Sequence, residues 1–145
     1  MDQEVISHSV EETLDIAEEF AKKNLLPGSV VVLRGELGAG KTQFTKGIAR
    51  SFGLLDEEIS SPTYALVNEY HISSSIVERL YHLDCYRFVK PEELLELGVE
   101  EYLYPKRAVT IIEWPERIES FLPGGRIEVA IETIAPTQRR IIIRK

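Results

Sequence analysis

The sequence predicts an α/β fold with a mixed, mainly parallel central sheet. Two apolar runs, Ser29–Arg34 ("SVVVLR") and Ala108–Ile112 ("AVTII"), are continuous rather than alternating, which is typical of strands buried on both faces of a parallel sheet. Helical periodicity precedes and follows the first run, so helices alternate with strands. The chain has 145 residues, the size of one ordinary domain, and we expect a single domain over residues 1–145.

The first predicted helix begins at Val10. Ser9 and Glu12 have the spacing of a capping box, in which each side chain bonds the backbone of the other residue. Pro27 and Gly28 then end the helix. Its core-facing positions repeat at helical spacing: Val10, Leu14, Ala17, Ala21 and Leu25.

A second helix is predicted from Lys41, with Gly53 just after its C-terminus. Phe44, Ile48, Ala49 and Phe52 share its apolar face. Two strands follow, Tyr64–His71 and roughly Val77–Tyr86. The polar turn "SSS" separates them, so we expect an antiparallel hairpin.

The last third of the chain contains short elements. A short helix is expected from Pro91 to Gly98, and another is expected to follow Pro115. The tail alternates as two strands, Arg126–Thr133 and Arg139–Arg144.

Composition and charge exclude several classes of protein. The single Cys85 excludes an internal disulfide framework and is typical of a reducing cytoplasm, where we expect the protein. No run approaches the roughly 18 apolar residues of a membrane span, and the N-terminus lacks a signal-peptide pattern. The net charge of −7 argues against broad binding to nucleic-acid phosphates by this chain alone.

The stretch "GELGAGKT", Gly35–Thr42, matches the pattern G-x-x-x-x-G-K-[ST] in full. Glycines let successive N–H groups point at one anion, and a following helix adds partial positive charge. Lys41 supplies a full charge to the β- and γ-phosphates, and the Thr42 hydroxyl can bind Mg²⁺. A chance glycine turn is the alternative, but a strand precedes this loop and a helix follows it. The sequence therefore predicts a P-loop NTPase-like, three-layer fold.

A P-loop needs an acid to complete its magnesium site, and two candidates stand at strand ends. Glu113 follows "AVTII", and Asp84 stands in "YHLDCYR". Ligands bind at the carboxyl edge of such sheets, which is where both acids are delivered. The alternatives are a solvated acid at a helix start for Glu113 and a salt bridge to Arg87 for Asp84.

Other polar residues carry weaker signals. Ser60–Thr63 follows the P-loop helix, where P-loop enzymes often sense the γ-phosphate, although "SPT" alone indicates only a turn. His82 is interpreted as a packed or hydrogen-bonding residue and Cys85 as a buried apolar one. Trp114, beside Glu113, either covers the site, stacks on a partner or fills the core.

The nucleotide is predicted to be ATP. GTPases usually carry an N-K-x-D element that reads the base and a D-x-x-G after a strand, and this chain has neither. Residue spacing does not reveal the contacts to the adenine ring.

Five segments occur in order: "GELGAGKTQFTKG", "SPTYALVNEY", "YHLDCYRF", "EELLELG" and "IIEWPE". Together they resemble the bacterial TsaE family, also called YjeE, from about Thr13 to Glu116. The resemblance implies a P-loop ATPase of tRNA threonylcarbamoyladenosine biosynthesis. By the same resemblance, such an ATPase would work beside the proteins TsaB and TsaD, which transfer the threonylcarbamoyl group to the adenosine next to the anticodon.

The resemblance also implies residue roles. The loop residues Glu36, Leu37, Gly38, Ala39 and Gly40 would bind ATP phosphates together with Lys41. Thr42 and Glu113 would hold Mg²⁺, and Thr63 and Asp84 would be needed for hydrolysis with Lys41. Thr13 and a tail arginine, Arg139 or Arg140, would lie near the nucleotide.

Three functions remain open at this point. The first is a Mg²⁺-dependent ATPase, weak alone, in a complex with TsaB-like and TsaD-like proteins that would hold the tRNA. The second is a small-molecule kinase, which would need an acceptor pocket and an arginine-bearing lid. The third is a non-catalytic, ATP-gated adaptor.

Overall fold

The computed structural model describes residues 2–60, 67–73, 76–86, 92–96 and 98–145. Within them a seven-stranded sheet has the order β1-β7-β6-β2-β5-β4-β3. Its four central strands run parallel: β6 (Ile127–Ala135), β2 (Val30–Arg34), β5 (Ala108–Glu113) and β4 (Arg79–Asp84). The outer strands pair antiparallel: β1 (Gln3–Ser7), β7 (Gln138–Arg144) and β3 (Val67–His71). The predicted α/β fold with its mixed sheet and its β3–β4 hairpin is confirmed.

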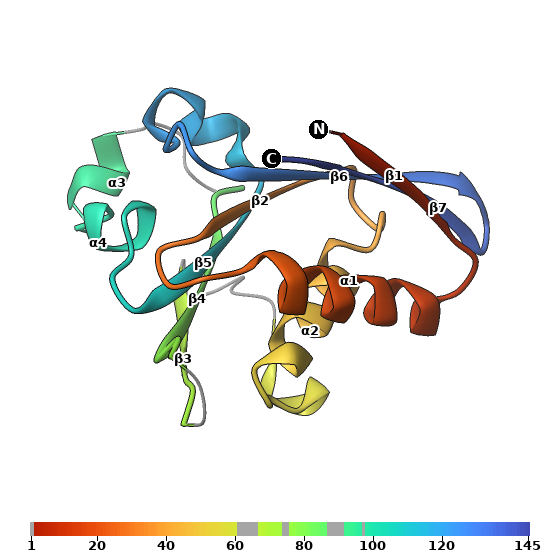
Figure 1. The fold of residues 1–145 in the computed structure, drawn as a ribbon. Coiled ribbons are helices and arrows are strands. Elements are labelled where there is room, and N and C mark those ends of the chain that lie inside the picture. Colours follow the sequence, from red (N-terminus) through yellow and green to blue (C-terminus); the bar gives the residue numbers. More distant parts are fainter. Residues whose placement is uncertain (1, 61–66, 74–75, 87–91, 97) are drawn as a thin grey trace.

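Helices cover both faces of the sheet (Figure 1). One face packs against α1 (Val10–Asn24) and α2 (Lys41–Ser51). The opposite face packs against α4 (Glu100–Leu103) and the 3₁₀ segment η2 (Pro115–Phe121). A short 3₁₀ segment, η1 (Asp56–Glu58), follows α2. A short helix, α3 (Glu92–Glu96), precedes α4. In the described part of the chain, no helix is long and apolar enough to cross a membrane.

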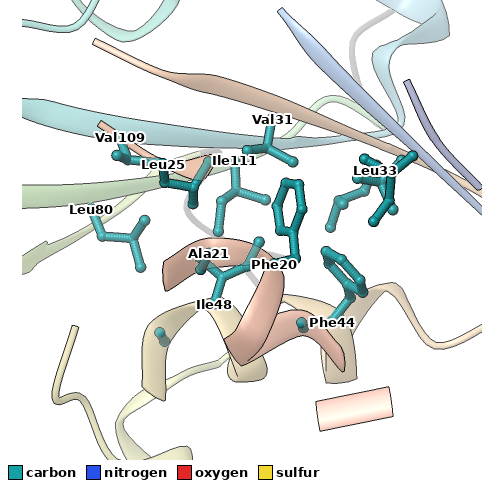
Figure 2. Packing of buried hydrophobic residues seen from close by; sticks show 14 of the residues in the cluster. Phe20, Ala21, Leu25, Val31, Leu33, Phe44, Ile48, Leu80, Val109 and Ile111 are labelled. Atoms are coloured by element: carbon teal, nitrogen blue, oxygen red, sulfur yellow. The ribbon is translucent and has the colours of Figure 1, made fainter. Parts of the chain in front are cut away.

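The main core lies between the sheet and the pair α1–α2, and aromatic side chains join its layers (Figure 2). The rings of Phe20 and Phe44 lie 5.6 Å apart, and both are buried. Burial of a side chain of this size stabilises the fold by about 1.5–3 kcal/mol. The backbones of α1 and α2 also approach closely, because a Cβ on Gly47 would lie 2.5 Å from the Leu14 carbonyl oxygen.

The start of α1 differs from the prediction in two details. Ser9 Oγ accepts the Glu12 N–H at 3.0 Å, as in a capping box, but the Glu12 carboxylate accepts a bond from His8 Nδ1 at 3.2 Å. Val10 does not face the core, since 58% of it is exposed. The strand β1 and the segments η1 and α4 were not predicted.

Candidate functional site

The parallel pairing brings the glycine loop and both candidate acids to one edge of the sheet. Leu33 of β2 pairs with Glu113 of β5, and Glu113 also stands opposite Asp84 of β4. The loop continues directly from the end of β2 into α2. Ligands bind at the carboxyl edge of such parallel sheets, so this edge is the candidate site.

A cavity of about 740 Å³ opens at this edge. Its wall includes nine of the residues predicted from the sequence: Thr13, Leu37, Gly38, Gly40, Lys41, Thr42, Asp84, Glu113 and Arg139. Glu36 and Ala39 belong to the loop but do not line the cavity, since Glu36 is exposed to solvent and Ala39 is buried in the main core. Thr63 lies outside the described residues.

The backbone of the loop depends on its glycines. Gly38 and Gly40 have φ values of +81° and +107°, which disfavour residues with a Cβ. A Cβ on Gly35 would lie 2.7 Å from the Ile131 carbonyl oxygen. Gly40 is the N-cap of α2 and no side chain caps this helix end, so the first-turn N–H groups are left for an anion.

Lys41 is a buried lysine in the cavity wall, with 6% of its surface exposed. Its Nζ donates to the Gly35 carbonyl oxygen and lies 3.4 Å from the centroid of the Trp114 ring. Burial lowers the pKa of the Lys41 ammonium, and the neighbouring carboxylate of Glu113 acts in the opposite direction. The side chain therefore places a poorly hydrated cation beside the uncapped helix end.

The two acids differ in their surroundings. Glu113 is 5% exposed, which excludes the alternative of a solvated acid, and its Oε2 accepts a hydrogen bond from His82 Nε2. Asp84 Oδ1 accepts the Tyr86 N–H at 3.0 Å. Burial raises the pKa of the Asp84 carboxyl, and the nearby Glu113 raises it further. Arg87, the alternative partner of Asp84, lies outside the described residues.

The oxygen ligands in the wall fit Mg²⁺ better than a transition metal. Among the described residues, no three His, Cys, Asp or Glu side chains form a metal-binding group. Mg²⁺ usually takes one or two carboxylates and fills its remaining positions with phosphates and water. The Thr42 hydroxyl and the Glu113 carboxylate, with Asp84 beside them, are such a set.

The opposite wall comes from α1 and from the turn between β6 and β7. Thr13 is buried, and its Oγ1 lies 2.6 Å from Ser7 Oγ. The Arg139 guanidinium donates from Nε to the Ala39 carbonyl oxygen at 3.1 Å and from Nη1 to the Ala135 carbonyl oxygen at 3.1 Å. Arg139 therefore ties the glycine loop to the β6–β7 turn.

Arg140, the alternative to Arg139, is directed elsewhere. It forms ion pairs with Glu4 and Glu132 on the neighbouring strands, both at 3.1 Å. Of the two tail arginines, only Arg139 contributes to the cavity wall.

Trp114 is half-buried in the cavity wall, so it covers the site and does not fill the core; stacking on a partner stays a prediction. Its φ of +56° is unusual for a residue with a side chain and marks local strain of about 1–3 kcal/mol. Its ring lies 4.9 Å from that of Tyr86, a wall residue that sequence reasoning missed. Nearby, Arg34 pairs with Glu119 and Glu128 at 2.6 Å each, which fixes η2 to the strand that precedes the loop.

Sequence reasoning also missed the wall residues His8, Pro136 and Thr137. They lie at the end of β1 and in the β6–β7 turn, next to the predicted Thr13 and Arg139. No motif marks them; only the pairing of β1 with β7 brings these two segments together.

Comparisons with known proteins agree on one family. The family whose pattern matches residues 7–141 is described as "Threonylcarbamoyl adenosine biosynthesis protein TsaE". Proteins named tRNA threonylcarbamoyladenosine biosynthesis protein TsaE are similar to this chain. The one from Treponema pallidum is 41% identical over 80% of this chain and 82% of its own length. The one from Bacillus subtilis is 40% identical over 90% and 78%.

The fold is also similar to a solved structure. A crystal structure of Bacillus subtilis YdiB superposes with a TM-score of 0.77, at 32% identity, over 99% of this chain and 84% of that one. The resemblance seen in the sequence motifs is thereby confirmed: the chain belongs to the TsaE family.

Proposed function

We propose that the protein binds ATP with Mg²⁺ in the 740 Å³ cavity and hydrolyses it, as the ATPase subunit that supports threonylcarbamoyladenosine modification of tRNA. The observation that carries this proposal is one juxtaposition. An uncapped helix N-terminus, the buried cation of Lys41 and the paired acids Asp84 and Glu113 surround one cavity. A nucleoside triphosphate presents the matching negative charge to that helix end and lysine.

Each residue has a distinct task in this proposal. The first-turn amides of α2 and the Lys41 ammonium bind the phosphates. Thr42 and Glu113 would hold Mg²⁺, which when bound neutralises charge on the phosphate oxygens. Asp84, whose pKa is raised by burial and by Glu113, orients the attacking water and accepts its proton. Thr63 is assigned to the same step from the resemblance alone.

The cellular role follows from the relatives. Their printed names assign them to tRNA threonylcarbamoyladenosine biosynthesis, and we extend that role to this chain. TsaB-like and TsaD-like proteins are the proposed partners. The net charge of −7 favours indirect contact with tRNA, through those partners. The single, buried Cys85 favours the reducing cytoplasm as its location.

An ATPase assay of the chain alone and with the TsaB-like and TsaD-like proteins tests the proposal. We expect slow phosphate release by the chain alone and a faster rate with the partners. Phosphorylation of an added metabolite would instead establish a kinase. Unchanged tRNA modification by a variant that binds ATP without hydrolysing it would establish an adaptor.

A pair of lysine variants tests the phosphate site directly. Lys41→Ala removes the buried cation and is expected to weaken ATP binding at least about 100-fold, since charged contacts in such sites are strong. Lys46→Ala, in the same helix but outside the cavity wall, is the matched control and is expected to bind normally. Unchanged affinity of Lys41→Ala would overturn the proposal.

A further inference from the structure

We infer that His82 is a positioning residue that holds the Glu113 carboxylate in the orientation needed to bind Mg²⁺. This inference rests on the proposed function, because it takes Glu113 as the magnesium ligand. His82 itself contacts neither metal nor nucleotide, since it is fully buried and absent from the cavity wall.

Adjacent strands bring the two side chains together. In the parallel pairing of β4 with β5, His82 stands opposite Ile111, two residues before Glu113. Side chains two residues apart on a strand share a face, so His82 and Glu113 lie on the same side of the sheet. The hydrogen bond from His82 Nε2 to Glu113 Oε2 therefore joins a residue outside the cavity wall to a residue in it.

The burial of His82 determines which ring nitrogen carries the proton. No described residue bonds Nδ1, and the atom has no access to solvent. A proton on Nδ1 would be a buried donor with no acceptor among the described residues, which is costly, whereas an N–H at Nε2 faces a carboxylate. An N–H at Nε2 therefore donates to one defined oxygen of Glu113.

This arrangement has a consequence for metal binding. A glutamate has three rotatable side-chain bonds. If metal binding must also fix these bonds, the lost conformational entropy weakens the affinity for the metal. The bond to Oε2 orders the carboxylate in advance and leaves Oε1 for the metal. Residues that hold metal ligands in this way typically change metal affinity by about 10- to 100-fold when replaced.

Core packing alone does not account for His82. An apolar side chain would fill the same space without burying a ring nitrogen that has no partner among the described residues. Its neighbours on this face of β4 and β5, Leu80 and Ile111, are apolar and fully buried. The polar residue stands where the carboxylate needs a donor.

Three variants of His82 separate positioning from packing. His82→Gln keeps an N–H donor at nearly the reach of Nε2. His82→Leu has similar volume and no donor, and His82→Asn has a donor that is too short to reach. Each is measured with a fluorescent ATP analogue, titrated with Mg²⁺ and also studied in EDTA, and its melting temperature is recorded.

We expect His82→Leu and His82→Asn to raise the Mg²⁺ concentration for half-maximal effect about 10- to 100-fold, as for other residues that support metal ligands. Binding in EDTA should change much less, and His82→Gln should restore the Mg²⁺ response. If His82→Leu does not fold, the comparison of His82→Asn with His82→Gln decides. An unchanged Mg²⁺ response, or an equal loss in EDTA, would overturn the inference.

Glu113→Gln, measured in parallel, distinguishes this inference from the proposed function. A shifted Mg²⁺ response for Glu113→Gln with none for His82→Leu would refute only the role of His82. No Mg²⁺ response in any protein, including the unmodified chain, would refute both.

Discussion

Asp84 and Glu113 stand directly opposite each other in the parallel pairing of β4 with β5, yet their environments differ. Glu113 is buried and bonded to His82, whereas Asp84 accepts a backbone N–H and its pKa is raised by burial. Two carboxylates in unlike environments commonly divide the work of an active site. We therefore propose that Glu113 binds the metal and that Asp84 accepts the proton.

Replacing each acid by its amide tests this division. Glu113→Gln is expected to weaken ATP binding in Mg²⁺ more than binding in EDTA, because the metal loses a charged ligand. Asp84→Asn is expected to keep ATP binding and to lower the hydrolysis rate about 100- to 10,000-fold, the usual contribution of a general base. Equilibrium binding and phosphate release measured on both variants check this.

The opposite pattern of effects in the two variants would contradict these roles of Glu113 and Asp84. If Asp84→Asn removes the Mg²⁺ dependence and Glu113→Gln does not, Asp84 is the better metal ligand. Glu57→Gln is a suitable control, because this exposed acid lies outside the cavity wall.

Trp114 is expected to report ATP binding through its fluorescence. It is the only tryptophan in the chain, and the Lys41 ammonium lies 3.4 Å from its ring centroid. Such a contact is worth about 0.5–2 kcal/mol, less than charged bonds to phosphate, so ATP should draw the ammonium away. A saturable emission change on ATP addition is the expected result. The same change in Lys41→Ala would contradict this explanation.

Gly47→Ala is expected to destabilise the fold without entering the cavity. The added methyl group would lie 2.5 Å from Ala17 Cβ and from the Leu14 carbonyl oxygen, so α1 and α2 must separate. Overpacking of this kind typically costs about 1–3 kcal/mol, measurable by urea unfolding. Gly125→Ala, whose methyl group would meet nothing within 4 Å, is the control. Equal stability of the two variants would show that the helices adjust freely.

Cys85 is expected to resist thiol reagents in the folded protein. It is fully buried, and burial raises the pKa of its thiol to about 12, so almost no reactive thiolate is present at pH 8. Labelling with a chromogenic disulfide should be slow in buffer and rapid in guanidinium chloride. Rapid labelling of the folded chain would show that this end of β4 opens readily.

Much of the fold could be predicted from local patterns. The continuous runs of β2 and β5 and the apolar face of α2 are each set by residues close in sequence, and the structure contains all three. The glycine loop between β2 and α2 and the two acids at the strand ends were predicted in the same way, and the structure places all three at one edge of the sheet. Such elements can be predicted because the hydrophobic pattern of their own residues determines them.

The remainder depends on pairing between distant segments. The strand β1 has only five residues and is recognisable as a strand only through its pairing with β7. The bond between His82 and Glu113 spans 31 positions, and the one between Arg139 and Ala39 spans 100. From the sequence, His82 was interpreted only as a packed or hydrogen-bonding residue; its partner follows from the strand register, which no local pattern reveals.

The order of the strands also has a consequence for synthesis of the protein on the ribosome. The strand that precedes the glycine loop, β2, pairs with β5 and β6, and β1 pairs with β7. A growing chain that has just completed the glycine loop therefore lacks both neighbours of β2, and Arg139 is added later still. Contacts this distant in sequence form slowly. The cavity is therefore assembled only as β6 and β7 emerge.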